Sequence, residues 1–364
     1  MRRLTHDVTR GPMRGPMRRR ARQAGVAVIT ALLLTTLAVT IVASLFWQQQ
    51  VQVRSMENQR LHLQTKWIMR GALDWARLIL QQDKNSNPTV TSETGAWATP
   101  LAETRLDDYV ERERIANEKF DATLSGRVTD AQARYNLFNL VSGNGPDPAQ
   151  VQVFRRLLQR LSLNPSLAQS LAEEVALSRQ VAPGPGGTGG TGGTGGTGGT
   201  GGVGGTGGTG GVGGAGGGLA GSSNGTRREP LGLIRVEDLL AVSGFTPPMI
   251  EKLREFVIVL PDLTKVNVNT APAEVLAALV DCSVSEAATM IQFRRRTPFN
   301  TEADFKSYLS GQTGRSLPDG VSVDVKSNYF LVLSYVRLDR AALDTQSLIG
   351  RGGKSPVLVW MREI

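Results

Sequence analysis

The sequence predicts an α+β protein in which a long N-terminal helix and several shorter helices precede a closing antiparallel sheet. Apolar positions recur at helical spacing over residues 26–83, and helical spacing returns between residues 151 and 309. Near the C-terminal end the apolar period becomes two, which predicts strands over residues 329–338, 344–348 and 357–361. A hydrophobic fraction of 40% supports a buried core for these elements.

The first element is a candidate membrane span from Val26 to Trp47, which contains no charged residue. A helix over this run is about 33 Å long and can cross a hydrocarbon core of about 30 Å. Its hydroxyl side chains are tolerated because they can bond back to helical carbonyls. Trp47 ends the run, where interfacial aromatic side chains are common. A cleaved secretory signal is the alternative, for which Ala43 and Ser44 offer only a weak cleavage site.

The positive charge of the chain is concentrated before this span. Residues 1–25 hold eight Arg and one Asp, so they contribute +7 of the net charge of +9. Such a basic flank predicts a cytoplasmic N-terminus, with the rest of the chain across the membrane. The remaining chain is nearly neutral, which speaks against binding to a polyanion.

The segments after the span read as a stalk, a group of helices and a loop. Residues 48–83 continue the helix out of the membrane, and Asn85 to Pro88 ends it. Residues 120–128 look strand-like, and residues 151–180 give two amphipathic helices. The tract 184–226 is glycine-rich and is expected to be a flexible loop.

Helical patterns resume after the glycine-rich tract. An extended segment that leads into a helix covers residues 266–276 and is the most distinctive stretch of the sequence. The other expected helices cover residues 235–242, 247–259, 284–296 and 301–309.

The scarcity of His and Cys excludes several kinds of chemistry. Only His6 and His62 are present, and both precede residue 84, so the large C-terminal part has no imidazole for a Ser-His-Asp triad or a zinc site. Cys282 is the single cysteine, and we expect it to be a small buried residue. No nucleophile–base pair is visible, so the sequence predicts a non-enzymatic protein without catalytic residues.

The junction before the span resembles that of type IV prepilins, in which a basic leader ends in Gly directly before a hydrophobic helix. Here the resemblance implies that a prepilin peptidase cleaves between Gly25 and Val26 and methylates the new amine. Pilins of this type carry Glu at the fifth mature position, where this sequence has Thr30. That Glu pairs with the amine of a neighbouring subunit, so Thr30 implies a subunit with no neighbour above it. A start at Met17 would shorten the leader to nine residues.

Several ordered motifs together resemble the K-type minor pseudopilins of the type II (general) secretion pathway. They are the leader with Gly25, Thr30 in place of Glu, residues 126–140, the VNVNTAPAEVLAAL stretch at 266–279, and residues 326–330. The resemblance implies a pilin-like antiparallel sheet that is interrupted by a large inserted all-α domain of the helix-hairpin-helix or SAM-like kind.

With this resemblance the chain divides into consecutive regions. They are a prepilin-type leader (1–25), a transmembrane helix (26–47), a stalk helix (48–83), the first part of the pilin-like domain (84–130), the inserted helical domain (131–319) with its glycine-rich loop (184–226), and the C-terminal strands of the pilin-like domain (320–364).

The resemblance also implies a function. Such a subunit caps the tip of the secretion pseudopilus, helps to initiate its assembly, and takes part in exporting folded proteins across the outer membrane. Its partners would be the I-type and J-type minor pseudopilins, other pseudopilus subunits and the prepilin peptidase. It would be a single-pass protein of the bacterial inner membrane, with a cytoplasmic N-terminus and a periplasmic C-terminal domain.

No cofactor is expected, and the sequence bears on the calcium that the family can bind. Relatives follow the helix at 164–180 with an acidic stretch and a Pro-Gly-acidic loop. Here Glu173 and Glu174 lead directly into the glycine-rich tract, and residues 181–226 contain no carboxylate. Because calcium needs several convergent oxygen ligands, we assign no metal ligands.

The alternative function is a membrane-anchored, DNA-binding receptor of the competence type. Residues 266–305 also look like a helix-hairpin-helix module, which grips phosphates through the amides of a glycine-rich hairpin. This chain has Asp281 to Val284 at that place, with no glycine and one anion. Arg294 to Arg296 could touch a nucleic acid, but three basic residues at a helix end are more often a solvated terminus that the helix dipole favours. We therefore predict no nucleic-acid partner.

Overall fold

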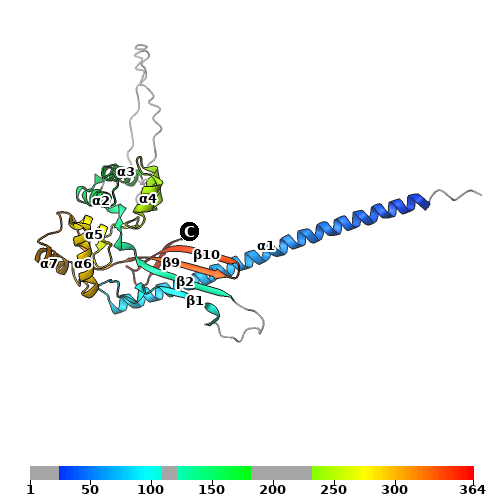
Figure 1. The fold of residues 1–364 in the computed structure, drawn as a ribbon, viewed down its shortest axis with the longest axis horizontal. Helices are drawn as coiled ribbons and strands as arrows, with labels where there is room; N and C mark the ends of the chain where they lie inside the picture. The colour runs from blue at the N-terminus through cyan, green and yellow to red at the C-terminus, as the bar shows by residue number, and fades with distance from the viewer. Residues whose placement is uncertain (1–23, 109–120, 144, 182–231) are drawn as a thin grey trace, which may run out of the picture.

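A computed structural model describes residues 24–108, 121–143, 145–181 and 232–364. Most of the predicted leader, and all of the predicted loop 184–226, lie outside the described residues. The described part has one long helix, an antiparallel sheet along the C-terminal half of that helix, and a group of shorter helices at one end of the sheet (Figure 1). This is the α+β arrangement that the sequence predicts.

The N-terminal helix α1 (Ala24–Ser86) runs without interruption through the predicted span and stalk. Its first half projects away from the body, and its second half lies along the sheet (Figure 1). The buried stripe of the second half is Met69, Leu73, Ala76 and Leu80, each at most 4% exposed. The adjacent apolar stripe of α1, to which Trp75 belongs, lies at the edge of the packed face, because Trp75 is 49% exposed.

Five antiparallel strands form one sheet in the order β1-β2-β9-β10-β11. The three predicted C-terminal strands and the strand near residue 120 are confirmed. The polar edge strand β1 was not predicted, because its five residues leave most side chains in solvent and show no period of two. The bounds are β1 (Leu101–Arg105), β2 (Ala122–Asp130), β9 (Tyr329–Leu338), β10 (Ala341–Gly350) and β11 (Val357–Glu363).

Alternate residues of the sheet face α1 and form the core of this half of the protein. Phe330, Val332 and Ile349 pack with Leu73 and Trp97 in one buried cluster. The rings of Trp97 and Phe330 meet edge to face at 5.2 Å between centroids. The amphipathic stripe of the stalk is therefore satisfied by burial against strands that come from the other end of the sequence.

The remaining elements lie between β2 and β9 in the chain. The helices are α2 (Pro148–Arg160), α3 (Leu167–Val181), α4 (Pro247–Leu253), α5 (Ala273–Val280), α6 (Val284–Arg296) and α7 (Glu302–Tyr308). The short strands are β3 (Tyr135–Asn136), β4 (Val141–Ser142), β5 (Gly145–Pro146), β6 (Val257–Ile258), β7 (Val266–Asn267) and β8 (Val323–Asp324).

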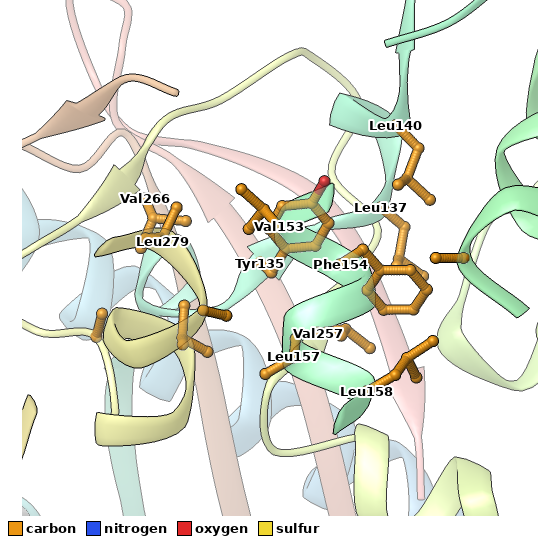
Figure 2. Packing of buried hydrophobic residues seen from close by; sticks show 14 of the residues in the cluster. Tyr135, Leu137, Leu140, Val153, Phe154, Leu157, Leu158, Val257, Val266 and Leu279 are labelled. Atoms are coloured by element: carbon orange, nitrogen blue, oxygen red, sulfur yellow. The ribbon is translucent and has the colours of Figure 1, made fainter. Parts of the chain in front are cut away.

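A single large apolar cluster joins these helices (Figure 2). Tyr135 and Phe154 lie at its centre, with their rings stacked at 5.8 Å between centroids. Leu157 and Leu158 of α2 and Leu279 of α5 are buried in the same cluster. A second hydrophobic core thus supports the helical part independently of α1 and the sheet.

Two predicted helices differ from the structure. The predicted helix over 247–259 ends at Leu253, because β6 pairs in parallel with β3. The backbone N–H of Tyr135 also donates to the carbonyl of Phe256 at 2.8 Å. The predicted helix over 235–242 is a 3₁₀ helix, η5 (Val236–Ala241). In both places tertiary pairing decides the backbone where the apolar spacing alone favours an α-helix.

Candidate functional site

The first half of α1 has the properties of a membrane anchor. From Val26 onward α1 is the only helix, among the residues that the structure describes, that is long and apolar enough to cross a membrane. Its large apolar side chains from Val26 to Trp47 are all at least half exposed, so nothing in the described part of the chain covers them. Trp47 itself is 73% exposed at the end of the apolar run. These observations are compatible with a single inner-membrane anchor.

The hydroxyl groups of this segment bond within the helix. Thr30 Oγ1 donates to the carbonyls of Val26 and Ala27, each at 3.0 Å. Thr35, Thr36 and Thr40 donate in the same way to carbonyls three or four residues earlier. Thr30 therefore needs no polar partner from another chain, whereas a carboxylate at this position would need one.

The predicted cleavage position lies at the start of α1. The helix begins at Ala24, so Gly25 and Val26 are both helical. Cleavage between Gly25 and Val26 stays a prediction.

The most concentrated polar site joins the sheet to the helical part and centres on Asp130, the last residue of β2. One of its carboxylate oxygens, Oδ2, accepts from Thr270 Oγ1 at 2.6 Å, Ser327 Oγ at 2.5 Å and Asn267 Nδ2 at 3.0 Å. The other, Oδ1, accepts from the backbone N–H of Gln132 at 2.8 Å. Burial raises the pKa of Asp130, and these four hydrogen bonds oppose that rise.

Asn267 extends this site toward the end of the stalk. Its Nδ2 also donates to the carbonyl of Thr91 at 3.0 Å and approaches Ser327 Oγ at 2.8 Å. Its Oδ1 accepts from the N–H of Asn269, whose side chain exchanges two hydrogen bonds with the backbone of Phe299. Asn267 thus connects three segments that are far apart in the sequence.

A second polar set fastens the residues just after β2. Gln132 donates to the carbonyl of Lys265 at 3.0 Å and accepts from the N–H of Asn328 at 2.5 Å. Asn136 donates to the carbonyl of Asp262 at 2.8 Å and accepts from the N–H of Leu260 at 3.2 Å. The three internal motifs of the sequence therefore meet in one place, where they form the junction between the sheet and the helical part.

A buried ion pair fastens the end of the stalk to the same junction. Arg351 Nη1 donates to Asp83 Oδ2 at 2.5 Å, and the two side chains are 1% and 3% exposed. Arg351 Nη2 donates to Thr91 Oγ1 at 2.7 Å and to the carbonyl of Ser327 at 3.1 Å. This pair was not predicted from the sequence. Its detectable sign was the position of Asp83, a charged residue that follows Ala76 and Leu80 on the buried stripe of α1.

The arginines at the end of α6 need a correction. The prediction of a solvated helix terminus at Arg294 to Arg296 is right for Arg295 and Arg296, which are exposed, and wrong for Arg294. Arg294 is 4% exposed and donates to the carbonyl of Val268 at 2.6 Å and to Glu93 Oε1 at 3.3 Å. Burial lowers the pKa of Arg294 to about 10. The buried face of α6, not the helix dipole, decides its role.

The hairpin between α5 and α6 uses its own amides. Asp281 adopts a left-handed backbone with φ 57°, and both its N–H and that of Cys282 donate to the carbonyl of Ala277. The N–H of Ser283 donates to Glu286 Oε2 at 2.7 Å. These hydrogen bonds from Ser283, together with Arg315, hold the pKa of Glu286 at about 2. The N–H groups of Asp281, Cys282 and Ser283 are therefore already bonded and do not offer donors to a phosphate, which the carboxylate of Asp281 would also repel.

The carboxylate of Glu173, ahead of the glycine-rich tract, bonds within its own helix. Glu173 Oε1 accepts from Gln169 Nε2 at 2.8 Å on the surface of α3. Nowhere in the described ranges do three or more His, Cys, Asp or Glu side chains gather closely enough to hold a metal ion. Cys282 is buried, as predicted, and burial raises the pKa of its thiol.

Comparisons with known proteins agree with this architecture. Two family models described as "Type II secretion system (T2SS), protein K" match residues 133–191 and 266–325. Type II secretion system protein K from Pseudomonas aeruginosa is 28% identical over 94% of this chain and 93% of its own length. The chain is therefore similar over most of its length to the type II secretion system protein K family. The protein K of Pectobacterium carotovorum is 22% identical over 93% of this chain and 95% of its own length.

A solved structure supports the same fold. It is a chain of the crystal structure of the GspK-GspI-GspJ complex from the type 2 secretion system of enterotoxigenic Escherichia coli. The TM-score is 0.58 at 18% identity, with 85% of this chain and 99% of that chain covered. The two family models include Asn136 and Asn267 of the junction, whereas Asp130 and Ser327 lie outside them. Together these similarities support a minor pseudopilin of type II secretion.

Proposed function

We propose that this chain is the subunit that caps the tip of the type II secretion pseudopilus, helps to initiate its assembly and so takes part in exporting folded proteins across the outer membrane. Thr30 is the observation that carries the proposal. Its hydroxyl bonds to Val26 and Ala27 within its own helix, at the position where pilins carry a Glu that needs a neighbouring subunit. A subunit without that need can occupy the place with no neighbour above it.

Processing and topology complete the proposal. A prepilin peptidase removes the basic leader after Gly25 and methylates the amine of Val26, while the apolar segment to Trp47 anchors the chain in the inner membrane. The basic leader keeps the N-terminus cytoplasmic, and the sheet and helical part are periplasmic. The protein acts without catalysis and without a cofactor.

The proposed partners are I-type and J-type minor pseudopilins. The similar solved chain comes from a GspK-GspI-GspJ complex, and the fold of this chain matches nearly all of that chain. The exposed first half of α1 offers the uncovered apolar surface that helix packing between subunits requires.

Sequencing the N-terminus of the protein from membranes tests the processing. We expect a methylated Val26 when prepilin peptidase is present and an intact leader when it is absent. An intact leader in the presence of the peptidase, or cleavage near Ser44, would contradict the pilin interpretation.

Co-purification with I-type and J-type subunits from the same membranes tests the place at the tip. Thr30→Val should leave co-purification unchanged, because the hydroxyl contacts only its own helix. Thr30→Glu should reduce it severalfold, because a carboxylate with no amine above it is costly in hydrocarbon. Improved co-purification of Thr30→Glu would indicate that another subunit lies above this one in the pseudopilus and would contradict a place at the tip.

No described contact favours the DNA-binding alternative. The amides of residues 281–283 are bonded within the hairpin, and Asp281 is paired with Arg156 at 3.3 Å. A gel-shift assay of the detergent-solubilised chain at several salt concentrations checks this point. Tight, salt-dependent DNA binding would reverse the ranking of the two functions.

A further inference from the structure

A cleft of about 380 Å³ lies between the sheet and the helical part, on the face of the sheet opposite α1. Its floor is apolar and includes Leu331 of β9, Ile258 of β6 and Trp360 of β11. Four arginines from separate segments line it: Arg134, Arg235, Arg254 and Arg362. The volume is that of a small ligand site, and segments from β6, β9, β10, β11 and the helical part line it.

Arg134 is the least compensated of these arginines. It is only partly exposed, and no hydrogen bond or ion pair to its guanidinium occurs within the described ranges. Burial lowers the pKa of Arg134, and the charge of Glu255 partly opposes that shift. Its guanidinium lines the cleft beside Glu255 and keeps its N–H donors free of any hydrogen bond to the described residues.

Arg362 offers a second guanidinium. It stacks on the ring of Trp360, with its central carbon 4.1 Å from the ring centroid, and donates to the carbonyl of Ile234 at 3.2 Å. No carboxylate within the described residues pairs with it. The stacking holds the planar group in place and leaves further donors available.

The other two arginines are neutralised locally. Arg254 pairs with Glu237 at 3.0 Å and with Glu251 at 3.4 Å, and Arg235 pairs with Asp238 at 3.4 Å. Arg134 and Arg362, which approach the cleft from the helical part and from β11, are therefore its arginines without an ion pair to the described residues, and Glu237 and Glu255 are the carboxylate side chains in its lining.

We propose that this cleft binds an acidic, extended peptide segment of another protein. A carboxylate of the peptide accepts hydrogen bonds from Arg134 and Arg362, and its apolar neighbours cover Trp360, Leu331 and Ile258. Planar guanidinium groups over an apolar floor fit a carboxylate flanked by apolar side chains. The site adds peptide recognition to this subunit and does not depend on a place at the pseudopilus tip.

A peptide array with the full chain in a non-ionic detergent tests the proposal. The array carries extended seven-residue peptides in which two Glu alternate with apolar residues, and each has a matched peptide with Gln in place of Glu. We expect binding to the Glu peptides, at least tenfold weaker binding to their Gln partners, and weaker binding as salt concentration rises. No binding to any Glu peptide, or equal binding to both series, would overturn the proposal.

Variants locate the binding site. Arg134→Gln and Arg362→Gln should each weaken binding to the Glu peptides at least tenfold, while Arg295→Gln, an exposed arginine of α6 outside the cleft, should leave it unchanged. Arg134→Glu should lose the preference for the Glu peptides over their matched Gln peptides. Thermal unfolding of each variant confirms folding, and retained co-purification with the other minor pseudopilins separates this result from the proposed tip function. Unchanged binding by folded Arg134→Gln and Arg362→Gln would contradict the site.

Discussion

At the scale of single residues, the first half of α1 and the junction differ in where charged side chains lie. The apolar first half of α1 carries no charge between Val26 and Trp47, whereas the junction buries Asp83, Asp130, Arg294 and Arg351. Desolvating a charge is expensive unless hydrogen bonds and a counter-charge replace the water. The buried side chains are therefore tied to many partners, and these ties fix how the segments meet.

Replacing Arg351 by Met should lower the free energy of unfolding by about 3–5 kcal/mol, because the substitution leaves Asp83 buried without its partner. Urea unfolding of the detergent-solubilised protein, followed by tryptophan fluorescence, measures this. Arg340→Met is the matched control, since Arg340 pairs with Glu57 at 3.1 Å in solvent and should cost about 0–1 kcal/mol. Equal effects of the two substitutions would contradict the role of the buried pair.

Asp130 should make stability depend on pH. Burial raises its folded pKa above the ordinary 3.8, so its favourable contribution is complete below pH 3.8 and is lost as pH rises through the folded pKa. The difference in unfolding free energy between wild type and Asp130→Asn should therefore shrink with rising pH. Urea titrations across that range measure the difference. A difference that grows with pH would show that the folded pKa is lowered instead.

At the scale of elements, close approach decides where strands can pair. Gly126 lies in the middle of β2 opposite Ser334 of β9. A Cβ atom added there would lie 2.6 Å from the carbonyl oxygen of Leu333, a backbone atom that cannot move without shifting β9. The glycine therefore lets the chain pair β2 with β9 and lead into the helical part.

Gly126→Ala should destabilise the sheet by about 1–3 kcal/mol through this overlap. Gly311→Ala is the matched control, because an added Cβ there meets nothing within 4 Å. Thermal unfolding followed by circular dichroism compares the two variants. A stable Gly126→Ala protein would mean that β2 and β9 can separate without cost.

At the scale of the whole molecule, two hydrophobic cores are joined by one polar junction. The stalk and sheet share one core, and the helices share another. Between them lies the polar network of Asp130, Asn267 and Ser327. Such a network is directional, so it fixes one relative orientation where apolar contact alone would permit several.

Asn267→Ala should therefore loosen the junction more than either core. Removing its side chain leaves the carbonyl of Thr91 without a side-chain donor and takes one of four donors from the carboxylate of Asp130, which should cost about 1–3 kcal/mol. Hydrogen exchange should show faster exchange at residues 266–270 and 325–328, with the centres of α2 and β9 less affected. Asn300→Ala on the exposed surface should change neither region. Uniform protection in Asn267→Ala would show that the junction adds no local rigidity.

The sequence predicted the elements that carry strong periodicity. The continuous α1, the capped α6 and the long strand β9 appear at their predicted positions, because local spacing and capping residues determine them. The polar strand β1 and the two-residue strand β6 were missed, because partners distant in the sequence supply their pairing. Arg294 was misplaced for the same reason, since burial depends on Glu93 and Val268.

By itself the sequence determined that a basic segment precedes one long apolar run, that helices stand between two groups of strands, and that ordered motifs resemble the protein K family. Only the tertiary structure showed that these motifs converge on Asp130 and that Arg351 meets Asp83. It alone revealed the cleft between Arg134 and Arg362. Local patterns depend on residues that are close in the sequence, whereas a junction and a cleft consist of groups that come together only when the chain has folded.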